Sequence, residues 1–312
     1  MREDDEPQTT ADGGSSIAVD SSGADDYSIY SNGTESATTS LKSSVLDFEY
    51  ENGRRYHAYK KGGENILAPI GDNPQRILDV GTGTGIWAMD VADRYPSAVV
   101  IGNDLSPIQP TWVPPNIQFE VDDVEAEWTY AADSFDLVHI RYMMACISDW
   151  PKLFKQAYRV TKPGGYLESA EPTLQIFCND GSLDLESPMA MWSKNMIKSA
   201  DLFGKPGNIA HLTKGWMIDA GFVNVEEKIL RLPVGPWPKD PLLKEIGRFN
   251  MLSGMQGLDG FTLALFTRVL GWSAEDVMKF IQTVKDQLLD RRTHAFANYH
   301  VVYGRKPEPE EK

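Results

Sequence analysis

The chain has 312 residues, of which 41% are apolar, and carries a formal net charge of −15. This length allows one large domain or two small ones with a sizeable buried core. An acidic surface repels phosphate backbones, so we expect no nucleic-acid partner, and no apolar run reaches the length of a membrane span.

Cysteine and histidine usage argues against disulfides and metal ions. The chain contains two cysteines and five scattered histidines, none of which pairs with a second ligand at metal-binding spacing. We therefore predict no metal site. Because the chain shows neither a disulfide framework nor the apolar core of a secretory signal, we expect it inside the cell, in the cytoplasm or the nucleus.

Residues 1–44 differ in composition from the rest of the chain. They carry nine acidic and two basic residues, and 19 of them are Ser, Thr or Gly. Such a segment buries too little apolar surface to offset its ordering entropy, which predicts a disordered acidic tail. The tail is either passive or a regulatory, partner-binding arm. We expect one folded domain at 45–306 and a charged C-terminal tail at 307–312.

The folded part begins as an alternation of short apolar strands and helices. β-branched and apolar residues fill the strands, whereas Pro and Gly end the helices. Strands are predicted at 76–80, 98–104, 116–121, 134–140 and 166–171, and helices at 86–95 and 150–160. This alternation predicts a parallel sheet with helices on both faces.

The alternation loosens after Glu171. Residues 172–206 mix Met, Trp, Pro and Gly, which favours a helical cap over the carboxyl edge of the sheet. The remaining elements are predicted as a helix at 208–220, a strand at 223–232, two or three helices within 240–292 and a strand at 299–305.

Methionine and aromatic side chains gather in the two cap regions, about 172–206 and 235–292. They form either a second hydrophobic core or an adaptable pocket for an apolar small molecule. These residues are Met189, Met191, Trp192, Met196, Phe203, Trp237, Met251, Met255 and Phe261.

The segment RILDVGTGTGIWAMD places three glycines where the first strand ends and a helix begins. Glycines there allow a tight turn and the close approach of a ligand, although a purely structural turn is the alternative. The loop lacks the lysine of a phosphate-binding P-loop, and Ile86 stands where a dinucleotide-binding loop has its third glycine. Asp79 would repel a pyrophosphate and favour a cation. S-adenosylmethionine fits, because it carries a sulfonium and an ammonium and no phosphate.

Carboxylates follow the next two strands. Asp104 ends the second strand, where nucleoside-binding folds place an acid against the ribose hydroxyls; a turn or N-cap aspartate is the alternative. Asp123 follows the third strand, where it can accept from an adenine amino group while the N–H of Val124 donates to the ring. The alternative is a solvated loop acid, an interpretation that applies more to Asp122 than to Asp123.

Together these segments resemble the class I S-adenosylmethionine-dependent methyltransferases. The resemblance rests on DVGTGTGIWAMD, VIGNDLSP, FEVDDVEAEW, SFDLVHIRYM and KPGGYLESAE in this order and spacing. YENGRRYHAYK near residue 50, the stretch at 112–116 and the terminal RRTHAFANYHVVYGRKP are similar to fungal LaeA-like methyltransferases. The resemblance covers about residues 46–306.

The resemblance implies an α/β fold with a Rossmann-like seven-stranded sheet of order 3-2-1-4-5-7-6, its last strand antiparallel, and a helical cap. It implies that S-adenosylmethionine lies across the carboxyl edge of this sheet. The glycine loop would line the methionine end, Asp104 the ribose and Asp123 the adenine. The implied cofactor-binding residues are Asp79, Gly81, Thr82, Gly83, Gly85, Asp104, Leu105, Asp123, Val124, Ile140 and Arg141.

The chain departs from the family pattern before the first strand. Relatives usually carry an acidic helix there, with a pattern like Glu-x-x-Arg-Leu-Asp-x-x-His. Here residues 60–65 run almost directly into Ile66. Because that helix helps to cover the cofactor in such folds, we expect the site to be less covered.

Methyl transfer is an in-line displacement at an activated carbon, so orientation and exclusion of water matter most. A general base is needed only for a poorly ionised acceptor, and no catalytic residue is assigned. The nearest polar candidates are His139, Arg141 and Tyr142. His139 lies in an apolar strand, which favours a hydrogen-bonded structural role. Arg141 either binds an acidic substrate group or pairs with a loop carboxylate.

The sequence therefore predicts a methyltransferase that acts on a small specialised metabolite. One alternative is a LaeA-like regulator of secondary metabolism, working through protein partners or by methylating a protein or itself. Another is a cofactor-binding pseudoenzyme. No membrane partner is expected.

Overall fold

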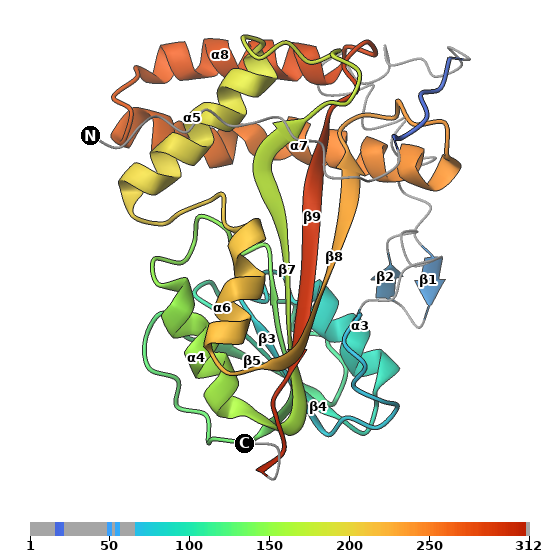
Figure 1. Ribbon diagram of the computed structural model, residues 1–312, viewed down its shortest axis with the longest axis vertical. Helices are drawn as coiled ribbons and strands as arrows, with labels where there is room; N and C mark the ends of the chain where they lie inside the picture. Colours follow the sequence, from blue (N-terminus) through green and yellow to red (C-terminus); the bar gives the residue numbers. More distant parts are fainter. Residues whose placement is uncertain (1–15, 22–48, 52–53, 57–65, 310–312) are drawn as a thin grey trace.

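The computed structural model describes residues 16–21, 49–51, 54–56 and 66–309. Its centre is a seven-stranded sheet of order β5-β4-β3-β6-β7-β9-β8 (Figure 1). The strands are β3 (Arg76–Val80), β4 (Val99–Asp104), β5 (Ile117–Val121), β6 (Phe135–Arg141), β7 (Thr161–Phe177), β8 (Val223–Pro233) and β9 (Phe296–Arg305). β9 is antiparallel to both neighbours, and the other pairs are parallel. This confirms the predicted order 3-2-1-4-5-7-6.

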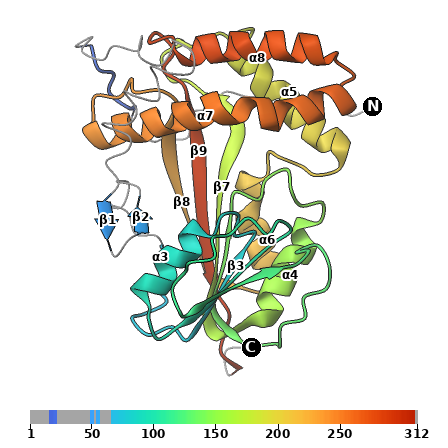
Figure 2. The ribbon, with the colours of Figure 1, turned by 180° about the vertical axis from the view of Figure 1, so that it is seen from behind.

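Helices cover both faces of the sheet, as the alternating pattern predicts (Figures 1 and 2). α3 (Ile86–Arg94) packs Trp87 and Val91 into one core, and α4 (Trp150–Val160) packs into the core of the opposite face. The carboxylate of Asp149 accepts from the Lys152 N–H at 2.9 Å and so caps the start of α4. The predicted helix at 208–220 divides into a 3-10 turn (Ala210–Leu212) and α6 (Thr213–Asp219).

β7 is much longer than its predicted span. It runs for 17 residues, because beyond Glu171 it continues beside β9, pairing Ile176 with Ala297 and Phe177 with Phe296. The two strands thus extend past the carboxyl edge and reach the cap, as Figure 1 shows. The cap consists of α5 (Pro188–Phe203), α7 (Pro241–Arg268) and α8 (Ala274–Leu288).

The cap has a hydrophobic core of its own. Met189, Met196 and Met251 are buried in it together with Phe266 from α7. These three methionines therefore fit the second-core interpretation of the cap rather than the pocket. Phe203 and Phe261 are exposed on the cap surface. Trp237 is buried, whereas Met191, Trp192 and Met255 are partly buried.

Little of the N-terminal region is described. β1 (Glu49–Glu51) and β2 (Arg54–Tyr56) pair as a separate antiparallel ribbon. Most of the predicted tail, the segment at 57–65 and residues 310–312 lie outside the described residues. In the described part, no helix combines the length and the apolarity needed to cross a membrane. Nor does that part bring three metal-ligating side chains together.

Candidate active site

The loop between β3 and α3 is built on left-handed glycines. Gly81, Gly83 and Gly85 have φ values of +69°, +57° and +78°, which favour glycine over a residue with a Cβ. A Cβ at Gly85 would lie 2.3 Å from the ring of Phe119, whereas no described atom lies within 4 Å of one at Gly83. The contact with Phe119 therefore explains why position 85 is a glycine, whereas the position of a Cβ on Gly83 is open space.

Asp79 lies beneath this loop and is 3% exposed. One carboxylate oxygen accepts from the Thr82 hydroxyl at 2.6 Å, and the other lies 2.8 Å from His139 Nδ1. A carboxylate has no proton to give, so Nδ1 of His139 carries the hydrogen. The His139 ring stacks on Trp87, with 3.6 Å between ring centroids and an angle of 6°. These contacts favour the structural role for His139.

Glu168 extends this buried row by one strand. It is the register partner of His139, which in turn is the partner of Asp79. Its Oε2 accepts from the N–H groups of Leu67 and Ala68, both at 2.7 Å. Burial raises the pKa of Glu168, although His139 and the two amides oppose the shift. The row therefore links the glycine loop to the chain that enters the sheet.

Asp104 meets the glycine loop at the end of β4. Its Oδ2 accepts from the Gly83 N–H at 2.8 Å, and its Oδ1 accepts from the Ser106 N–H at 2.9 Å. The neighbouring side chain of Asn103 accepts from the Gly81 N–H at 3.2 Å. The structure thus brings Asp104 and the glycines together, and it also gives Asp104 the turn contact that the alternative interpretation expects.

The turn after β5 is held by its own side chains. Asp123 accepts from the Glu125 N–H at 2.9 Å, and the Trp128 indole donates to the Val124 carbonyl at 2.9 Å. The side chain of Val124 is buried, whereas Leu105 after β4 is 67% exposed. The N–H of the adjoining Asp122 donates to the Asp104 carbonyl, so the ends of β4 and β5 lie side by side.

Glu125 joins three loops at this edge. Its carboxylate accepts from the N–H and hydroxyl of Ser148 at 2.6 and 2.5 Å and from Lys205 at 2.5 Å. Partial burial opposes ionisation, but these donors lower the pKa of Glu125 to about 2. Lys205 also donates to the Cys146 carbonyl. Sequence reasoning missed this cluster, because Glu125 and Lys205 are 80 residues apart.

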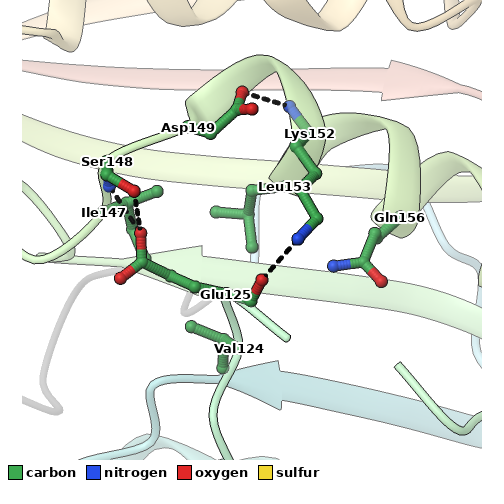
Figure 3. A pocket seen from close by; sticks show the side chains of 8 residues that line it. All are labelled: Val124, Glu125, Ile147, Ser148, Asp149, Lys152, Leu153 and Gln156. Atoms are coloured by element: carbon green, nitrogen blue, oxygen red, sulfur yellow. Dashed lines mark hydrogen bonds between the residues drawn. The ribbon is translucent and has the colours of Figure 1, made fainter. Parts of the chain in front are cut away.

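A cavity of about 270 Å³ lies beside the Glu125 cluster (Figure 3). Its wall includes Lys152, whose ammonium donates to the Glu125 carbonyl at 2.6 Å. The cavity therefore lies between the turn after β5 and the first turns of α4. It is lined by Val124, Glu125, Ile147, Ser148, Asp149, Lys152, Leu153 and Gln156.

The chain bends sharply after β6. Tyr142 has a φ of +57°, which is costly for an aromatic residue. The buried carboxylate of Glu171 holds this bend, accepting from the N–H groups of Met143 and Met144 at 2.9 and 3.1 Å. Burial raises the pKa of Glu171 to about 8, against the opposing effects of the two amides and Arg141.

The bend leaves the Tyr142 ring half exposed, 5.8 Å from the ring of Tyr299 on β9. Burial raises the pKa of the Tyr299 phenol. Arg141 is partly exposed at the end of β6, whereas the Ile140 side chain is fully buried in the core towards α4. Of the predicted residues at this end, only Arg141 and Tyr142 therefore present side chains at the edge.

Comparison with known proteins identifies the family. A family model described as a methyltransferase domain matches residues 50–227, more than half of the chain. The chain belongs to the methyltransferase domain family. The family, the order of the sheet and the glycine loop together identify the protein as an S-adenosylmethionine-dependent methyltransferase. The fold, enzyme class and cofactor predicted from the resemblance are thereby confirmed.

Relatives of this methyltransferase cover most of its length. "Methyltransferase pytC" of Aspergillus terreus is 38% identical, with 88% of this chain and 93% of the relative covered. "Secondary metabolism regulator LAE1" of Cochliobolus heterostrophus is 35% identical, with 83% and 94% covered. "Protein-methionine methyltransferase laeA" of Emericella nidulans is 30% identical, with 83% and 77% covered.

The site of this methyltransferase fits S-adenosylmethionine. The open space over Gly83 leaves room for a ligand against the loop backbone. The Asp79 carboxylate beneath the loop makes the surroundings favourable to positive charge and unfavourable to phosphate. The Asp104 carboxylate stands at the same edge, within reach of the loop.

Gly83→Ala tests whether the open space over the loop is a ligand site. We expect a loss of about 1–2 kcal/mol in the free energy of unfolding, because of the left-handed backbone, together with a large loss of S-adenosylmethionine affinity. Gly71→Ala is the matched control, since Gly71 has a φ of +72° and no described atom within 4 Å of an added Cβ. Urea unfolding and calorimetric titration measure the two effects. Equal affinities in the two variants would contradict a ligand at Gly83.

Glu171→Gln is expected to change the pH dependence of stability. The folded pKa of about 8 exceeds the ordinary value of 4.5, so the contribution of Glu171 is full below about pH 4.5 and is lost as pH rises through 8. The variant should therefore gain on the wild type by roughly 2–4 kcal/mol between about pH 5 and pH 8. Urea unfolding of both proteins at the two pH values measures this. A constant difference would show that Glu171 is already ionised at pH 5 in the folded protein, so that its pKa is not raised.

Proposed function

We propose that the protein transfers a methyl group from S-adenosylmethionine, bound between the glycine loop and Asp104, to a small specialised metabolite. The observation that carries the proposal is the contact between Asp104 and Gly83 beside open space over the loop. In the proposed complex, Asp104 and Leu105 hold the ribose, and Asp123 and the Val124 N–H hold the adenine. A link to specialised metabolism is supported by the relative named as a secondary metabolism regulator.

The loop residues hold the methionine end in this proposal. Gly81, Thr82, Gly83 and Gly85 supply the backbone, and Asp79 supports the ammonium group through its hydrogen bond with Thr82. When bound, S-adenosylmethionine supplies an activated methyl group on a sulfonium. The chain's own contribution is to fix the loop through the buried row of Asp79 and its partners.

At the acceptor end, Arg141, Tyr142 and Tyr299 surround the proposed transfer point. The paired tyrosine rings favour a flat, aromatic acceptor, and the guanidinium favours one with an acidic group. Glu171 is fully buried, so its role is to hold the bend that presents Tyr142. An acceptor that ionises by itself needs no further base, because Arg141 stabilises its anion.

Protein methionine methylation is a second candidate, favoured by one observation. The Met143 sulfur lies over the glycine loop, 2.2 Å from the position that a Cβ on Gly81 would take. A relative 30% identical is named as a protein-methionine methyltransferase. In this interpretation a methionine sulfur is the acceptor, and the protein acts as a regulator together with protein partners.

Two measurements test these functions, the first of them the donor site that both share and the second the difference between them. Calorimetric titration with S-adenosylmethionine tests the donor site, and absence of binding to folded protein would overturn both candidates. Metabolite profiles after deletion of the encoding gene then distinguish them. Accumulation of one unmethylated compound supports a metabolite acceptor. Loss of many unrelated compounds, together with a protein methyl group that is present in the wild type and absent from the deletion strain, supports the regulator. Donor binding without any transfer would identify a pseudoenzyme.

A further inference from the structure

Six residues of the N-terminal region, 16–21, lie against the cap near the start of α7 (Figures 1 and 2). Val19 and Pro238 form an isolated antiparallel bridge. The Asp20 N–H donates to the Trp237 carbonyl at 2.9 Å, and the Lys239 N–H donates to the Ala18 carbonyl at 2.8 Å. This contact is not predicted from the composition of the tail.

The chemistry of this bridge suits the residues on both sides. The two hydrogen bonds flank the pair Val19 and Pro238, so neither residue of the pair has to donate. Proline has no N–H and is tolerated in a β-ladder at such a position. The backbone of residues 237–239, here called the receiving edge, is therefore not weakened by the proline. Its Lys239 N–H and Trp237 carbonyl can pair with an extended peptide.

An ion pair adds specificity to the backbone contact. The Asp20 carboxylate binds the ammonium of Lys244 in the first turns of α7. Both side chains are largely shielded, at 20% and 17% exposure. A partly buried charge pair discriminates against a neutral side chain at this position more strongly than an exposed pair does. The site thus favours an acidic residue over a neutral one at the position directly after the residue that pairs with Pro238.

The receiving edge is held rigidly by the cap. The Trp237 indole is buried and donates to the Ala295 carbonyl at 3.0 Å. The Gly235 N–H donates to the Gly247 carbonyl at 3.0 Å, and the two glycine backbones are so close that a Cβ on Gly247 would collide with Gly235. The edge therefore needs no peptide to form it, as in sites that recognise peptides by strand addition.

We propose that residues 237–239 and Lys244 form a peptide-binding site for an extended segment that carries an acidic residue directly after the residue paired with Pro238, and that residues 17–20 occupy it as an intramolecular ligand. The tail is tethered, so its effective concentration at the site is high. A partner segment of the same chemistry has to displace the tail before it binds. The tail is then a competitor that limits access to the cap.

The first test uses the full chain and amide hydrogen exchange. We expect protected N–H groups at Asp20 and Lys239, with exchange about tenfold faster in Asp20→Asn or Lys244→Met. Lys279→Met is the matched control, because Lys279 pairs with Glu275 on an exposed helix surface. The control should leave both amides protected. Unprotected amides in the wild type would overturn the proposal.

The second test supplies the ligand from outside. A labelled synthetic peptide of residues 14–24 is titrated into full-length Asp20→Asn, whose own tail is weakened, and into the wild type. We expect the variant to bind the peptide about tenfold more tightly than the wild type, and a peptide with Asn in place of the aspartate to bind weakly. No binding to the variant, or equal binding of both peptides, would overturn the proposed site.

Discussion

Asp104→Ala is expected to weaken S-adenosylmethionine binding by about 100-fold or more. The proposed role of Asp104 is to accept two hydrogen bonds from the ribose, each worth roughly 1.5 kcal/mol or more with a charged acceptor. The variant also releases the N–H groups of Gly83 and Ser106. Calorimetric titration measures the loss, and thermal unfolding checks that the loop change has not unfolded the protein.

Two further variants make this result specific. Asp104→Asn keeps one acceptor oxygen and the side-chain shape, so its affinity should fall between those of the wild type and the alanine variant. Asp122→Ala removes a neighbouring carboxylate, which accepts a hydrogen bond from the Asp123 N–H. The proposal assigns Asp122 no contact with the cofactor. We expect less than a threefold change for it, about 0.6 kcal/mol. Equal affinities for the Asp104 and Asp122 alanine variants would show that the ribose acid is misassigned.

His139→Ala is expected to lower the free energy of unfolding by about 3–5 kcal/mol. The variant removes the donor to a buried carboxylate on Asp79 and leaves a cavity beside Trp87. Urea unfolding measures the change. His139→Asn should recover part of the loss, since its amide can donate to Asp79 although it cannot stack.

His211→Ala is the control for the histidine substitution. His211 is exposed at the surface of the domain, so its removal should change the free energy of unfolding by no more than about 0.5 kcal/mol. If His139→Ala cost as little, the Asp79 carboxylate would not depend on its buried partner. The contact with Thr82 alone would then hold Asp79 in place beneath the glycine loop.

The fold was largely predictable because its signals are local. The strand ending at Val80, the glycines and the helix beginning at Ile86 stand within a few residues of one another. The buried role of His139 was also readable, since apolar neighbours surround it in the strand. The class I sheet order came from the resemblance and not from the strands themselves.

What the sequence did not reveal depends on contacts between distant segments. The extension of β7 beyond Glu171 requires pairing with β9, which follows more than a hundred residues later. Glu168 stands out in its apolar strand, yet its partner amides are 100 and 101 residues away. The tail contact at Val19 likewise forms with Pro238. Such pairings leave no periodic pattern in either segment alone.

The continuation of β7 and β9 from the sheet towards the cap, with a register shift between Pro172 and Ile176, has a mechanical consequence. A domain that swings over its ligand turns about a few residues that absorb large changes in backbone angle. Here both β7 and β9 pass from the sheet to the cap and pair again at Ile176 and Phe177, so a large rotation would have to be absorbed by two paired strands at once. We therefore expect the cap to keep its orientation relative to the sheet, and the loops at the carboxyl edge to rearrange when a ligand enters.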